Sequence, residues 1–279
     1  QLRREIYEPM LKIMNESTRA TAEKELSPTE FPRTYVNEDH SFKGPRHSQD
    51  SVLCPDSPHP SMTLGETLQE LEAIQHFRGL TELVEKHLRL HRIDTERDLT
   101  SNKNIFGVFD GAGTPDGSQI ASRLAAYVLQ NRAQAWSDQP LEDVEPQLGA
   151  ALIQLHTLVV GLGATIATEY RLRHPGSHTA YDSMGTTACT GQLGKMRDGR
   201  DAFLLGNVGD SEAFHWDEER GIATRISPDN TDFLGYGPTG LKARPHTRIT
   251  PLNPGYKILL MSDGINKFLD PEDVDDTVC

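Results

Sequence analysis

Cysteine is scarce in this sequence, which has only Cys54, Cys189 and Cys279 among its 279 residues. Their number is odd and their spacing matches no zinc motif, so the sequence does not indicate a disulfide framework. This usage suits a reducing compartment, and we expect the protein to be intracellular. The chain begins with Gln1 instead of Met. We therefore expect its natural start to lie upstream, and a removed targeting segment stays open.

Basic residues and long apolar runs are also in short supply. Lysine and arginine total 28 against 41 acidic residues, which gives a formal net charge of -13. Such a surface repels nucleic acid and anionic membranes, so we expect neither as the main partner. The longest apolar stretch, residues 148–168, contains Gln154, His156 and Thr157. It therefore indicates a buried helix and not a membrane span.

The remaining composition is that of a folded soluble domain, since 36% of the residues are hydrophobic and can form a sizeable core. Apolar periodicity predicts an N-terminal helix over about residues 1–26 and a helical segment over about 63–92. Two further helices are predicted around residues 120–128 and 144–155. Short β-prone runs predict strands near 51–53, 104–109, 186–193, 202–208, 212–216 and 257–261.

Acidic turns follow several of the predicted strands. Asp110 and Asp263 each follow an apolar run and precede a glycine, and Asp210 comes after Gly209 in the reverse order. A single Asp-Gly turn of this kind is most simply a hairpin signal. A set of them places carboxylates at strand ends, where the missing glycine side chain lets another ligand approach the same cation.

The segments around these turns carry a family resemblance. They read SQDS (48–51), GVFDGAG (107–113), DSMGTTA (182–188), NVGDS (207–211) and LLMSDGI (259–265). In this order they resemble the motifs of the protein phosphatase 2C (PP2C) family, metal-dependent protein serine/threonine phosphatases. The resemblance covers about residues 40–279.

The resemblance implies a fold and a domain organisation. The family fold is α+β, a β-sandwich of two antiparallel sheets flanked by helices on both faces (αββα). We expect residues 1–279 to form one such domain. The helical segment at 63–92 is then an insert, longer than the family leads us to expect at this place.

The resemblance also implies a metal centre. Asp50 and Asp110 would bind two bridging cations, Gly111 would add its carbonyl oxygen, and Asp263 would bind one cation. Asp182 would serve a weaker third site. Oxygen ligands alone suit Mg²⁺ or Mn²⁺ better than zinc.

The implied reaction is direct hydrolysis of phosphoserine or phosphothreonine on another protein. A water shared by two cations would attack phosphorus without a phosphoenzyme, with Asp50, Asp110 and Asp263 as the catalytic carboxylates. The sequence leaves the substrate protein and the oligomeric state open.

The chain departs from the family pattern in several places. Ala112 stands where the family has a histidine that assists the leaving group, and Glu212 stands where it often has arginine. The phosphate-binding arginine would fall at Pro45, so Arg46 is a substitute shifted by one residue.

The family's final Asp-Asn ligand segment does not occur before Cys279. Either C-terminal sequence is missing, as we expect, or the second metal lacks a carboxylate. The alternative function is a weak or inactive pseudophosphatase that acts as a binding or scaffold protein, and a third is a regulatory module that cations stabilise.

Two other features point to structure more than to chemistry. His87 and His91 have a spacing that can hold zinc, but they lie among basic residues and indicate a solvated helix face. Cys189 indicates a buried strand residue and not a nucleophile.

Overall fold

The computed structural model describes residues 51–53, 79, 81–93, 105–113, 115–176, 184–217, 219–235, 241 and 244–263. All of them belong to one compact unit of the chain, Tyr35–Cys279. The predicted N-terminal helix at 1–26 and the first part of the insert, residues 63–78, lie outside the described residues. The single-domain organisation stays a prediction.

A five-stranded antiparallel sheet organises the described residues. Its order is β1-β2-β5-β6-β10, formed by Ser51–Leu53, Ile105–Phe109, Ala188–Lys195, Asp201–Val208 and His246–Pro251. The first four of these strands were predicted from the sequence and are confirmed, whereas β10 was not predicted.

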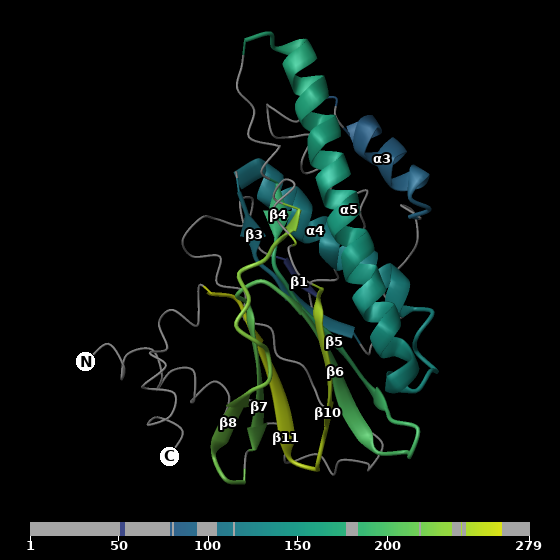
Figure 1. The fold of residues 1–279 in the computed structure, drawn as a ribbon, viewed down its shortest axis with the longest axis vertical. Coiled ribbons are helices and arrows are strands. Elements are labelled where there is room, and N and C mark those ends of the chain that lie inside the picture. The colour runs from purple at the N-terminus through teal and green to yellow at the C-terminus, as the bar shows by residue number, and fades with distance from the viewer. Residues whose placement is uncertain are drawn as a thin grey trace, which may run out of the picture. The chain divides into compact units, whose positions relative to one another are not determined.

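Two smaller antiparallel sheets accompany it (Figure 1). One has the order β11-β7-β8, formed by Tyr256–Met261, Glu212–Asp217 and Ile222–Arg225. The other has the order β3-β4-β9, formed by Gly111–Ala112, Gly185–Thr186 and Leu234–Gly235. The predicted strands at 212–216 and 257–261 are confirmed as β7 and β11.

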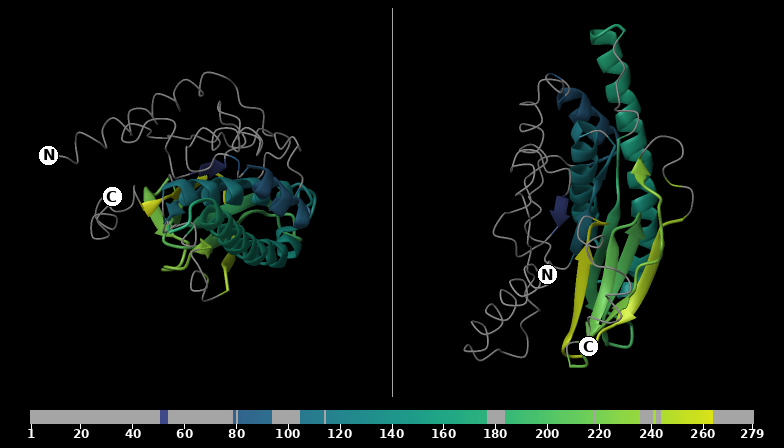
Figure 2. Two further views of the ribbon diagram at one scale, coloured as in Figure 1. Left: turned by 90° about the horizontal axis from the view of Figure 1, so that it is seen from above. Right: turned by 90° about the vertical axis from the view of Figure 1, so that its left-hand side faces the viewer.

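Three helices are described: α3 (Thr81–Leu90), α4 (Pro115–Ala133) and α5 (Leu141–Arg173). The first packs on α5, α4 packs on β1 and β2, and α5 packs on β6, β9 and β10. Figure 2 shows α5 extending beyond the strands in its right-hand view. Both helices predicted between residues 120 and 155 are confirmed, and α3 confirms the last part of the insert.

The long helix α5 is apolar enough to cross a membrane by length and composition alone. Half of its most apolar window is buried within the structure, and Leu148, Leu152 and Leu162 belong to the main core. This burial is that of a core helix.

The five-stranded sheet separates two cores, because successive side chains of a strand point to opposite faces. On β6, Ala202 and Leu204 join the helix-facing core, while Phe203 and Leu205 join the core that also contains Ala213 of β7. Because β6 is buried on both faces, its sequence is a continuous apolar run, and this run predicted the strand. The mixed α+β class with two packed antiparallel sheets is therefore confirmed.

The helical layers of the expected sandwich are described on one side only. Within the described ranges, the main contacts between helices and strands go to the five-stranded sheet and to the small β3-β4-β9 sheet. A helical layer over β11-β7-β8 stays a prediction.

The prediction of a solvated basic face on α3 is wrong for His87. This side chain is partly buried, and its ring lies 3.2 Å from the point where a Cβ on Gly161 of α5 would stand. His91 is exposed, as predicted, with its ring centroid 4.8 Å from that of His87. Burial and the neighbouring His91 lower the pKa of His87, so the neutral ring packs on α5.

Candidate functional site

Several strand ends meet at one rim of the two sheets. Because β5 is antiparallel to β2 and β6, its first residue, Ala188, lies beside the ends of both. In the second sheet, Glu212 begins β7 and pairs with Met261, the last residue of β11. Asp110 follows β2 and Asp263 follows β11, and both are partly buried.

Two threonines hold the backbone of Asp110. Its N–H donates to Thr187 Oγ1 at 3.0 Å, and its carbonyl accepts from the Thr187 N–H at 2.8 Å. The hydroxyl of Thr186 donates to the same carbonyl at 2.9 Å. Both backbone polar groups of this residue are thus satisfied within the protein, which fixes the point from which its carboxylate projects.

A buried hydroxyl pair joins the two sheets at this rim. Thr187 Oγ1 and Ser211 Oγ lie 2.7 Å apart, and neither residue is more than 1% exposed. Ser211 immediately precedes Glu212, which pairs with Met261 of β11. Asp263 comes two residues after Met261. Hydrogen bonds and strand register therefore connect the Asp110 segment to the strand pair that leads to Asp263. Their convergence on one cation stays a prediction.

The segment after Asp110 forms one strand of the small β3-β4-β9 sheet. Ala112 pairs with Gly185, and Gly185 pairs with Gly235. The N–H of Gly235 donates to His156 Nδ1 of α5 at 3.1 Å, so this ring nitrogen is unprotonated. Burial lowers the pKa of His156, in agreement with that hydrogen bond.

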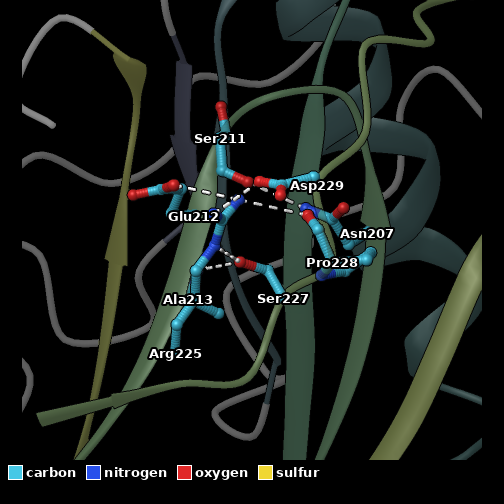
Figure 3. A network of polar contacts seen from close by, with 8 residues as sticks. All are labelled: Asn207, Ser211, Glu212, Ala213, Arg225, Ser227, Pro228 and Asp229. Atoms are coloured by element: carbon cyan, nitrogen blue, oxygen red, sulfur yellow. Dashed lines mark hydrogen bonds and ion pairs between the residues drawn. The ribbon is translucent and has the colours of Figure 1, made fainter. Parts of the chain in front are cut away.

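Arg225 holds the start of β7, as Figure 3 shows. Its guanidinium forms an ion pair with Glu212 Oε1 at 2.9 Å, and it donates to Asp229 Oδ1 at 2.6 Å and to the Pro228 carbonyl at 3.2 Å. Its Nε donates to Ser227 Oγ at 3.3 Å. Position 212, where the resemblance often has arginine, thus carries a glutamate that pairs with an arginine from β8, and these contacts already occupy the Arg225 guanidinium.

The remaining predicted site residues divide by location. Arg46, Asp50 and Asp182 lie outside the described residues. Gly111 lies on β3, where it pairs with Thr186. Cys189 is fully buried on β5, which confirms the predicted buried strand residue, and burial raises the pKa of its thiol to about 12.

The described oxygen donors are of the type that a hard cation prefers. Asp110, Asp263 and the Gly111 carbonyl offer oxygen atoms, the ligands that Mg²⁺ and Mn²⁺ prefer. Within the described ranges, no three His, Cys, Asp or Glu side chains gather as a metal-holding group. A metal centre at this rim therefore stays a prediction, and it needs the predicted Asp50 and Asp182 in addition to these oxygen atoms.

Comparison with known proteins decides the family. The sequence matches the family described as protein phosphatase 2C over residues 94–279. The chain belongs to the protein phosphatase 2C family. None of the curated proteins matches it.

Solved phosphatases resemble this family member only distantly. The serine/threonine phosphatase PstP/Ppp of Mycobacterium tuberculosis is 20% identical, with a TM-score of 0.44, over 62% of this chain and 74% of that one. A PstP catalytic domain in complex with two manganese ions is 21% identical, with the same TM-score, over 62% and 72%. Stp1 of Staphylococcus aureus is 17% identical, with a TM-score of 0.46, over 62% and 75%.

Sequence reasoning placed Thr187 and Ser211 inside family motifs but gave neither a role, and it missed the pairing of Arg225. The available signal was polarity inside buried strand segments. Threonines at 186, 187 and 190 occupy a run that is almost wholly buried. A buried hydroxyl needs a hydrogen-bond partner, so each of them indicated a contact.

Proposed function

We propose that this protein phosphatase 2C family member is a metal-dependent protein serine/threonine phosphatase. Its substrates would be phosphoserine and phosphothreonine side chains of other proteins, and Mg²⁺ or Mn²⁺ its cofactors. The observation that carries the proposal is the rim, where Asp110 and Asp263 follow strands of two sheets that are joined by the Thr187–Ser211 pair.

Each residue has a defined part in this proposal. Asp110, Asp263 and the carbonyl of Gly111 hold the cations together with Asp50 and Asp182, and Arg46 binds the substrate phosphate. Bound divalent cations supply a water of lowered pKa and neutralise charge on the phosphoryl oxygens. The threonine contacts to Asp110 keep its backbone in place while the carboxylate carries a negative charge toward the cations.

Ala112 favours the second candidate, a pseudophosphatase that binds partners without turnover. Its methyl group holds no proton to give to a leaving oxygen, a contribution typically worth about 10²–10⁴-fold in rate. Measured turnover separates this scaffold protein from a slow phosphatase.

The test is Mn²⁺-dependent hydrolysis of a phosphothreonine peptide by the full chain, with Mn²⁺ binding measured by calorimetry. Asp110→Asn should weaken Mn²⁺ binding and lower kcat/KM by about 100-fold or more, since even residues behind a metal ligand matter by 10–100-fold. Asp201→Asn is the matched control, because that exposed carboxylate stands at the start of β6 and forms an ion pair with Lys195 at 2.7 Å. Mn²⁺ binding without any turnover by the parent would replace the phosphatase proposal with the scaffold one.

A further inference from the structure

The hydroxyl pair of Thr187 and Ser211 is costly for a core to contain. Thr187 is 1% exposed and Ser211 0%, so neither hydroxyl can turn to solvent. Replacing both with apolar groups of the same shape costs a core little, whereas leaving one partner unpaired costs its full desolvation. The pair therefore adds little to stability, and its contribution is the specific geometry that it fixes.

The contacts around the pair are directional. Because Thr187 Oγ1 accepts from the Asp110 N–H, the pair relates the position of the Asp110 backbone to that of Ser211. Ser211 is itself held by Asn207 of β6, whose Nδ2 donates to the Ser211 carbonyl at 2.9 Å. Asn207 is fully buried. A shift of Ser211 relative to Thr187 would thus strain bonds in both sheets.

We propose that the Thr187–Ser211 hydroxyl pair is a positioning device that sets the distance between the carboxylates of Asp110 and Asp263, and through it the affinity for divalent cations. The inference rests on the proposed function. The pair touches no reacting atom. It acts through the Asp110 backbone on one side, and through Glu212 and Met261 on the other.

Thr190 of β5 provides a matched control three residues further along the chain. It is 0% exposed, and its hydroxyl donates to the Phe106 carbonyl of β2 at 2.7 Å, whereas Thr187, the residue before β5, contacts the residue after β2. Thr187→Val and Thr190→Val therefore each delete one buried, hydrogen-bonded threonine hydroxyl. Only the first lies beside the proposed ligands.

The experiment measures Mn²⁺ affinity of the full chain by calorimetry, together with hydrogen exchange of the Asp110 amide without metal. Thr187→Val should weaken Mn²⁺ binding by about 10–100-fold, as residues behind metal ligands do, and should speed exchange of that amide. Thr187→Ser keeps the hydroxyl and should retain affinity, and Thr190→Val should bind Mn²⁺ like the parent. Ser211→Ala, which leaves the Asp110–Thr187 bond in place, should weaken binding in the same direction and carries the test if Thr187→Val does not fold.

The outcomes separate the two proposals. Equal Mn²⁺ affinity in the parent, Thr187→Val and Ser211→Ala would overturn the positioning role and leave the phosphatase proposal standing. A parent chain that binds no Mn²⁺ would overturn both. An equal loss of affinity in Thr187→Val and Thr190→Val would also overturn the inference, since it would reflect general destabilisation of β5.

Discussion

Gly209 offers a sharp test of the rim geometry. Its φ is +100°, and a Cβ there would stand 2.7 Å from Thr187 Cγ2, 2.8 Å from Thr187 Cβ and 3.1 Å from the Asp232 carbonyl oxygen. Gly209→Ala therefore imposes two costs, a strained backbone and a collision with the residue that holds Asp110. Gly199 has a similar φ of +86° but no atom within 4 Å of its Cβ position, so Gly199→Ala imposes only the first.

The two costs can be estimated separately. A left-handed conformation costs an alanine about 1–2 kcal/mol, and the lower entropy of the unfolded chain returns about 0.4–1 kcal/mol of this. Gly199→Ala should thus lower the free energy of unfolding by about 1 kcal/mol. Overpacking of a buried site adds about 1–3 kcal/mol, so Gly209→Ala should cost about 3 kcal/mol. That is a large fraction of the 5–15 kcal/mol typical of a domain.

Urea denaturation of the parent and both variants without metal measures these free energies, and calorimetry adds their Mn²⁺ affinities. Gly209→Ala should lose both stability and Mn²⁺ affinity, because Thr187 must move away from the new methyl group. Gly199→Ala should keep the Mn²⁺ affinity of the parent. Equal losses of stability in the two variants would refute the close packing of Gly209 on Thr187, and with it this explanation of the glycine.

Three further predictions concern residues around the rim. Ala112→His should raise phosphopeptide turnover by part of the roughly 10²–10⁴-fold that acid catalysis contributes, whereas the control Ala112→Phe should bring no gain. An Ala112→His variant that binds Mn²⁺ but shows no turnover would favour the scaffold function. Because the pKa of His156 is lowered on folding, its stabilising contribution is complete above the unfolded value of about 6.5 and is lost as the pH falls below it. His156→Asn keeps a hydrogen-bond acceptor for the Gly235 N–H. The free energy of unfolding of this variant should therefore change less between pH 7 and 5 than that of the parent, and an equal dependence on pH in the two proteins would contradict this. Arg225→Met should cost about 1–3 kcal/mol in urea unfolding, the cost of a buried polar group left unsatisfied, since it leaves the largely buried Glu212 without its cation. A loss under about 0.5 kcal/mol would show that the pair contributes little.

The sequence was most informative where local pattern decides structure. Apolar periodicity predicted α4 and α5, and the run before Asp110 predicted β2. By contrast β10, which reads HTRITP, was not predicted, because it has no apolar run and its strand conformation comes from pairing with β6. The same limit applies to His87, whose helix was predicted but whose neighbour Gly161 lies on α5, far away in the sequence.

By itself, the sequence determined the order of the family motifs, the carboxylate and carbonyl oxygens that they carry, and the strand ends at which Asp110 and Asp263 stand. These properties depend on residue identity and on neighbours a few positions away. Only the tertiary structure decided that Thr187 ties Asp110 to Ser211, and that Arg225 pairs with Glu212. Such contacts join residues up to 77 positions apart in the chain, and they exist only once strand register and sheet packing bring those residues together.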